Sequence, residues 1–186
     1  MYKALVIGTS YGGLEALKKI IPYFPKDFPL AILIVLHIGD NNNDHFINYL
    51  NNHCNLFVKE AEDKEIIKAG TIYFAPPNYH LLVDENSQIA LSIDSRIHHS
   101  RPSIDVLFES AAWHYQNKLI GVLLTGLNQD GALGLKEIQE FGGLTIVENP
   151  NNAMASIMPA SAIKLIKPDF ILEIDQIASE ITKLIK

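Results

Sequence analysis

The sequence predicts one α/β domain over residues 1–186, with a mainly parallel, doubly wound sheet in three layers (α/β/α) and an inserted antiparallel hairpin. Strand-like apolar runs alternate with amphipathic helical stretches along most of the chain. The run 30–36 is uninterruptedly apolar, which is typical of a strand buried on both faces, as in parallel sheets. Residues 80–84 and 89–93 flank the turn-rich spacer 85–88, a pattern typical of a hairpin.

The amino-terminal part predicts a strand–turn–helix–strand unit. A strand at 4–7 meets a glycine-rich turn at 8–13, and the next stretch repeats apolar residues at helical spacing until Pro22. The strand at 30–36 follows and ends at His37. The middle of the chain is more polar, and its expected elements are a surface helix within 41–55, short strands at 71–75, 80–84 and 89–93, and a loop over 94–102.

The carboxy-terminal half returns to alternating strands and helices. Ser103 is expected to cap a helix that reaches about residue 116, because a serine hydroxyl can accept from the free N–H groups of a first turn. The expected elements after it are a strand at 119–125, a turn at 126–131, a helix at 132–141 ended by Gly142 and Gly143, a strand at 144–147, a short helix opened by Pro159, a strand at 170–174 and a closing amphipathic helix.

Composition excludes several classes of protein. The 186 residues are 48% apolar and 19% charged, unlike disordered chains. The net charge of −6 disfavours binding to nucleic acid, and no apolar run approaches the ~20 residues of a membrane span. Cys54 is the single cysteine, which excludes an internal disulfide or a cysteine-based zinc site and fits a reducing compartment. We therefore expect a cytoplasmic globular protein without membrane insertion.

Three polar residues each follow an apolar strand directly: Ser10, His37 and Asp130. Ligands collect at the carboxyl ends of parallel strands, so these side chains are candidates for one site. A serine, a histidine and an aspartate are the parts of a hydrolytic relay, in which serine attacks, histidine moves the proton and aspartate stabilises the imidazolium. Gly8-Thr9-Ser10-Tyr11-Gly12 also has the spacing of a nucleophile elbow between a strand and a helix.

Each motif has a plainer interpretation. The turn after the first strand also suits a phosphate or a simple helix cap, although a dinucleotide fingerprint fails because Ser10 replaces its second glycine. His37 alone is also explained as a core histidine, and Asp130 as a cap for the helix that follows it. His80 begins a strand and is a weak candidate for lining a site. The chain order of the three also differs from that of α/β-hydrolases.

These residues and their order resemble the catalytic domain of the chemotaxis protein-glutamate methylesterases, the CheB family, over 5 to about 164. The matching blocks are 8–13, His37, 75–80, 101–108, 124–132 and 158–159. The resemblance implies that Ser10 is the nucleophile, His37 the base and Asp130 the acid. It further implies hydrolysis of glutamate γ-methyl esters on the cytoplasmic helices of methyl-accepting chemoreceptors to glutamate and methanol, and deamidation of protein glutamines by the same acyl chemistry.

The sequence also departs from the family pattern. Tyr11 stands where threonine is usual, Leu36 where glutamine is usual, Leu127 where methionine is usual and Asn128 where glycine is usual. Tyr11 and Leu127 are expected beside the oxyanion or substrate, with Leu127 offering its backbone amide. No metal or cofactor is implied. The expected absence of a receiver domain indicates either a stand-alone form, regulated by a partner in trans, or a trimmed one.

Two other functions stay open: a serine esterase or amidase acting on a different substrate, and a non-catalytic signalling module that retains the triad.

Overall fold

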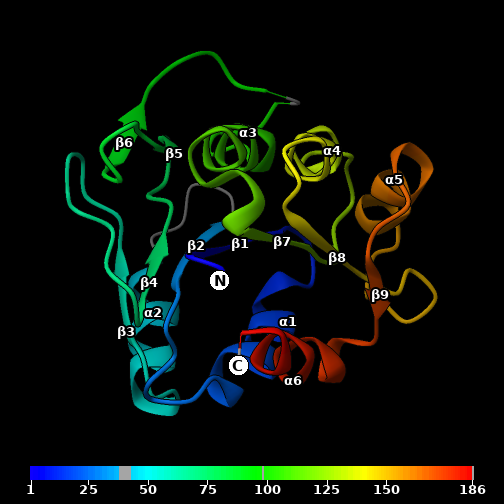
Figure 1. Ribbon diagram of the computed structural model, residues 1–186, viewed down its shortest axis with the longest axis horizontal. Helices are drawn as coiled ribbons and strands as arrows, with labels where there is room; N and C mark the ends of the chain where they lie inside the picture. Colours follow the sequence, from blue (N-terminus) through cyan, green and yellow to red (C-terminus); the bar gives the residue numbers. More distant parts are fainter. Residues whose placement is uncertain (38–42, 98, 186) are drawn as a thin grey trace.

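The protein is described by a computed structural model that covers residues 1–37, 43–97 and 99–185. Its main sheet has seven strands in the order β3–β4–β2–β1–β7–β8–β9, and every neighbouring pair is parallel (Figure 1). The strands are β1 Ala4–Thr9, β2 Ala31–Leu36, β3 Phe57–Glu60, β4 Thr71–Phe74, β7 Leu119–Leu123, β8 Leu144–Glu148 and β9 Phe170–Leu172. The doubly wound parallel sheet predicted from the sequence is confirmed.

Helices cover both faces of this sheet, as predicted. They are α1 Gly13–Ile20, α2 Asp44–His53, α3 Ile104–Tyr115, α4 Ala132–Glu140, α5 Ile157–Leu165 and α6 Ile174–Leu184, with single 3₁₀ turns at Ile21–Tyr23 and Gln116–Lys118. Figure 1 shows α1 and α6 on one face, and α3, α4 and α5 on the other. The apolar side chains of α2 join the cluster that α1 and α6 form.

Alternation along the central strands builds one core on each face. In β1, Leu5 and Ile7 pack into the α1 side, whereas Ala4 and Val6 pack into the α3 side, and all four are fully buried. A strand with apolar residues at every position is the expected result of this two-sided burial. Each large aliphatic side chain buried in this way contributes about 1.5–3 kcal/mol to folding.

The predicted hairpin is also present. β5 (His80–Val83) pairs antiparallel with β6 (Ile89–Ser92) and forms a separate two-stranded sheet. It lies against α3, where the Ser110 hydroxyl accepts a hydrogen bond of 3.2 Å from the Val83 N–H. The hairpin therefore adds cover to the α3 face instead of extending the main sheet.

Some element boundaries differ from the prediction. β3 has no counterpart in it, because Phe57 is 62% exposed on this edge strand and polar residues complete it. α5 begins two residues before Pro159. The last strand ends at Leu172 instead of 174, because Glu173 and Gln176 form a capping box that starts α6. Within the described residues, no helix combines the length and the apolar composition needed to cross a bilayer.

Candidate active site

The register of the sheet brings the ends of β1, β2 and β7 to one edge. Thr9 pairs with Leu36 of β2, and Gly8 pairs with Leu123 of β7. The chain winds in opposite directions on the two sides of β1, so this edge lies at the switch point where doubly wound sheets bind ligands. The backbone N–H of His37 donates to the Thr9 carbonyl at 3.1 Å, which fixes His37 beside Ser10.

The turn that carries Ser10 joins β1 directly to α1. The N–H of Gly13 donates to the Ser10 carbonyl at 2.8 Å, and Gly12 adopts the left-handed conformation with φ +82°. A Cβ at Gly12 would also approach the Met154 sulfur to 2.8 Å, so both the backbone and the space require glycine there. Ser10 is half-buried three residues before the start of α1, where the free N–H groups of the helix favour developing negative charge.

Thr125 fixes the turn that carries Ser10 through hydrogen bonds. Its carbonyl accepts from the Ser10 N–H and from the Thr9 hydroxyl, both at 3.0 Å, and its own hydroxyl donates to the Tyr11 carbonyl at 2.9 Å. The N–H of Thr125 donates in turn to the Glu148 carboxylate at 2.8 Å. Sequence reasoning missed both Thr125 and Glu148, although each is a polar residue at the end of an apolar strand.

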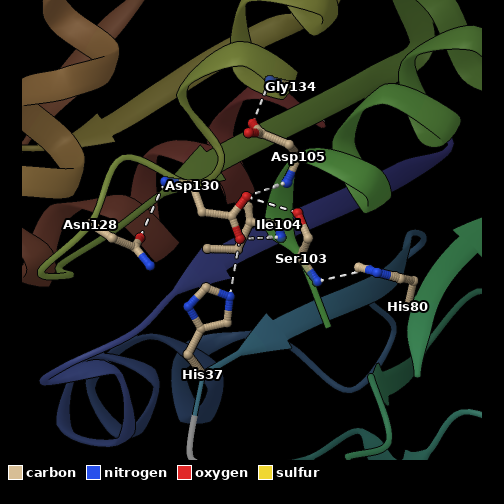
Figure 2. Close-up of polar contacts among 8 residues, drawn as sticks. All are labelled: His37, His80, Ser103, Ile104, Asp105, Asn128, Asp130 and Gly134. Atoms are coloured by element: carbon tan, nitrogen blue, oxygen red, sulfur yellow. Dashed lines mark hydrogen bonds and ion pairs between the residues drawn. The ribbon is translucent and has the colours of Figure 1, made fainter. Parts of the chain in front are cut away.

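Asp130 is fully buried and both of its carboxylate oxygens have partners (Figure 2). Oδ1 accepts from the Ser103 hydroxyl at 2.9 Å and from the Asp105 N–H at 3.0 Å. Oδ2 accepts from the Ile104 N–H at 2.7 Å and lies 3.1 Å from His37 Nε2. Asp130 thus joins the histidine to the amino-terminal end of α3.

Two sequence-based interpretations of these residues are wrong. Ser103 precedes α3 as predicted, but its side chain makes no cap hydrogen bond to the helix. Asp130 does not cap the helix that follows it; it caps α3, from 26 positions away along the chain. A carboxylate offers two charged acceptor oxygens to the first-turn N–H groups and is stabilised by the helix dipole, so it outcompetes a local hydroxyl.

The environment keeps Asp130 ionised. Burial alone would raise its pKa, but the contact with His37 and the N–H groups of Ile104 and Asp105 outweigh burial and lower the pKa below its usual value. Nε2 of His37 lies 3.1 Å from Asp130 Oδ2 without the alignment of a linear hydrogen bond, and this contact becomes an ion pair when the imidazole is protonated. Aspartate of this kind stabilises a neighbouring imidazolium.

The orientation of His37 assigns different partners to its two ring nitrogens. Nε2 faces Asp130, and Figure 2 shows Nδ1 on the opposite side of the ring. Nδ1 is therefore the ring nitrogen that does not face the carboxylate. Within the described residues no hydrogen bond yet joins the Ser10 hydroxyl to His37. Such bonds in hydrolases often tighten only when substrate is bound.

A second buried carboxyl links α3 to α4. Asp105 is 2% exposed, and its Oδ1 accepts from the N–H of Gly134 at 2.7 Å, in the first turn of α4. The loop before α4 thus caps α3 through Asp130, while the first turn of α3 caps α4 through Asp105. Burial raises the pKa of Asp105 to about 7, and the neighbouring charge of Asp130 adds to the shift.

Close packing fixes α3 against β1. A Cβ on Gly8 would collide with Cγ2 of Ile104, so only glycine lets the first residue of the helix approach the strand. Gly8 lies two residues before Ser10, and Ile104 directly follows Ser103. The packing therefore sets the distance between the serine turn and the aspartate cap.

The remaining predicted residues surround the serine turn or support it. Tyr11 and Leu127 are each 57% exposed. Within the described chain their backbone N–H groups make no hydrogen bond, which leaves both available to an oxyanion. His80 is buried and does not line the open site: its Nδ1 accepts from the Ser103 N–H at 3.1 Å. His98 of the predicted loop lies outside the described residues.

A cavity of about 260 Å³ lies beside the serine turn, between the start of α1 and the end of β8. Gly12, Lys19, Glu148 and Met154 are among its lining residues. Among the residues that the structure describes, no three His, Cys, Asp or Glu side chains gather as a metal site. The arrangement thus offers a serine hydroxyl, a histidine paired with a buried aspartate, and free backbone donors, which together suit acyl transfer.

Comparisons with known proteins agree with this chemistry. The sequence model of the CheB methylesterase family matches residues 5–181. A protein of Leptospira interrogans, provisionally named a protein-glutamate methylesterase/protein-glutamine glutaminase, is 49% identical over 98% of this chain and 95% of its own length. A protein of Clostridium acetobutylicum with the same name is 38% identical over 99% of this chain and 53% of its own length.

The fold has a close counterpart among solved structures. The crystal structure of the Thermotoga maritima CheB methylesterase catalytic domain superposes with a TM-score of 0.95 at 34% identity. The match covers 99% of each chain.

Proposed function

This chain belongs to the CheB methylesterase family, and we propose that it hydrolyses glutamate γ-methyl esters on the cytoplasmic helices of chemoreceptors through Ser10, His37 and Asp130. The observation that carries the proposal is the contact between His37 Nε2 and the buried Asp130 carboxylate, at the sheet edge where the turn carrying Ser10 leads from β1 into α1. A serine, a histidine and a buried aspartate at one strand edge suit acyl transfer.

The mechanism uses the two ring nitrogens of His37 for different partners. Ser10 Oγ attacks the ester carbonyl while His37 Nδ1 takes the hydroxyl proton, and the ionised Asp130 stabilises the imidazolium through Nε2. The negative charge on the carbonyl oxygen is met by the backbone N–H groups near Tyr11 and Leu127 and by the start of α1. His37 then returns the proton to the departing methoxide, and methanol leaves.

Deacylation repeats the same steps with water. His37 takes a proton from water, the resulting hydroxide attacks the acyl-serine, and the Ser10 oxygen recovers its proton as glutamate is released. A glutamine side chain enters the same cycle with ammonia as the leaving group. The paired names of the relatives favour this second activity.

The surroundings of Ser10 suit an apolar protein surface. Tyr11, Leu127 and Met154 are all more than half exposed beside or across from the serine turn. These side chains would contact the substrate helix on either side of the modified glutamate. The proposal implies a cytoplasmic location, where such receptor helices lie.

The decisive experiment measures methanol. Purified protein is mixed with methylated receptor cytoplasmic fragments, and methanol is compared between wild type and Ser10→Ala, which should lose about 10⁶ in turnover. A matched control is Ser161→Ala, which removes an exposed hydroxyl from α5 that bonds only within its own helix. Wild-type activity that persists in Ser10→Ala would overturn the assignment of the nucleophile.

Two further measurements distinguish the proposed function from the two alternatives. Release of methanol from small methyl esters but not from receptor fragments would indicate an esterase with a different substrate. Failure of Ser10 to react with a fluorophosphonate probe would indicate a non-catalytic module.

A further inference from the structure

Ser103 is one feature of this site that the mechanism does not use. It is fully buried, and its hydroxyl donates to Asp130 Oδ1 at 2.9 Å. The same carboxylate accepts from the backbone N–H groups of Ile104 and Asp105 and contacts His37, and the Asp105 carboxyl also interacts with it. Ser103 is therefore a neutral side chain outside the proposed triad that helps to hold the aspartate in place.

Ser103 is itself held rigidly. Its backbone N–H donates to Nδ1 of His80 at 3.1 Å, and Nε2 of His80 lies 3.2 Å from the Ser95 carbonyl. These two contacts require that His80 carries its proton on Nε2 and accepts on Nδ1. The first residue of the hairpin thus fixes Ser103, and Ser103 fixes the carboxylate.

The hydroxyl acts on the charge of Asp130 as well as on its orientation. A donor on Oδ1 keeps Oδ2 turned toward His37 and also withdraws negative charge from the carboxylate. Less negative charge on Oδ2 means weaker stabilisation of the imidazolium. The donor therefore favours the neutral imidazole, the form that serves as a base, over the imidazolium.

We propose that Ser103 is a positioning residue of the reaction, which sets the orientation of Asp130 and through it the basicity of His37. This inference deepens the proposed function and rests on it for its effect on turnover. The other ionisable groups facing Asp130 are Asp105 and Glu109 on α3, and Glu137 of α4 faces Glu109. All of them are unchanged in the variants below.

The test compares Ser103→Ala with wild type by two independent measurements. The first follows the imidazole of His37 by ¹⁵N NMR against pH, with its signal identified by its loss in His37→Gln. We expect the pKa of His37 to rise by about one unit in Ser103→Ala, since the carboxylate regains the charge that the hydroxyl withdrew.

The second measurement is the pH profile of methanol release. We expect kcat to fall by about 10- to 100-fold, which corresponds to the free energy of one hydrogen bond to a charged group. KM should stay within about twofold of the wild-type value. The acid limb of kcat/KM should move to higher pH by the same amount as the NMR titration. Ser103→Thr restores a hydroxyl and should return both values toward wild type.

Ser110→Ala is the matched control on the same helix. Its hydroxyl bonds to the Val83 N–H and to the Val106 carbonyl, away from Asp130, so its loss should lower stability without moving the pKa of His37. If Ser103→Ala fails to fold, Ser103→Cys keeps the shape with a weaker donor and should give a smaller shift of the same sign.

An unchanged His37 titration in a folded Ser103 variant would overturn the inference, as would equal shifts in Ser103→Ala and Ser110→Ala. The titration needs no substrate. A wild-type protein that releases no methanol would therefore refute the proposed function while the role of Ser103 is still decided by NMR.

Discussion

Replacing Asp105 by asparagine should make the protein more stable at alkaline pH and leave it nearly unchanged at acid pH. Asp105 lies 2% exposed beside Asp130, and burial raises its pKa from 3.8 to about 7. Asparagine keeps an oxygen to accept from the Gly134 N–H. It also replaces the titrating carboxyl by a neutral group of similar shape.

The magnitude follows from linkage between protonation and folding. Between the two pKa values the folded protein holds a proton that the unfolded chain has released, so wild type is most stable below 3.8 and loses stability as pH rises toward about 7. Each pH unit in this window costs about 1.4 kcal/mol. From pH 5 to pH 8, wild type should therefore lose about 3 kcal/mol relative to Asp105→Asn.

The assay is urea unfolding followed by circular dichroism at pH 5, 6, 7 and 8 for both proteins. The lowered pKa of Asp130 makes stability fall at acid pH instead, and this contribution is present in both chains. Asp27→Asn replaces an exposed aspartate and serves as the matched control, with parallel curves expected. Parallel curves for Asp105→Asn and wild type would refute the assignment of a buried, protonated carboxyl.

Three further substitutions test other parts of the site. Asp130→Asn should lower methanol release by about 10⁴, by analogy with other triads, and also lower the melting temperature; full turnover would remove aspartate from the mechanism. Gly8→Ala should destabilise by about 1–3 kcal/mol in urea unfolding, because its Cβ meets Ile104, and an unchanged midpoint would contradict that contact. Burial raises the pKa of Glu148, and a glutamine there can still accept from the Thr125 N–H. Glu148→Gln should therefore be more stable than wild type at pH 8 and equally stable at pH 4. Equal stability of the two proteins at both pH values would contradict a raised pKa of Glu148.

The elements that sequence reasoning predicted well share one physical property. Strands such as 31–36 are buried on both faces, so every position is apolar and the run stands out from its surroundings. β3 was missed because an edge strand exposes Phe57 at 62% and tolerates Lys59 and Glu60. When a strand of four residues is buried on one side alone, its pattern of apolar residues is too weak to be recognised in the sequence.

The candidate site divides in the same way. The sequence shows Ser10, His37 and Asp130 as candidates because each follows an apolar strand, and strand ends are visible in sequence. The contacts that hold them are not, because they join distant segments: Thr125 meets Thr9 across 116 positions, and Ser103 meets Asp130 across 27. Local preference assigned Ser103 as a cap, and only the folded chain reveals the carboxylate that takes its place.

The exchange of carboxylates between α3 and α4 has a mechanical consequence. If either helix slid along its axis by one turn, about 5.4 Å, the hydrogen bonds from Ile104 to Asp130 and from Gly134 to Asp105 would both break. The two cap contacts therefore couple the axial positions of α3 and α4. A disturbance at Tyr115, about 16.5 Å along α3 from Ile104, would reach the imidazole by tilting that joined pair.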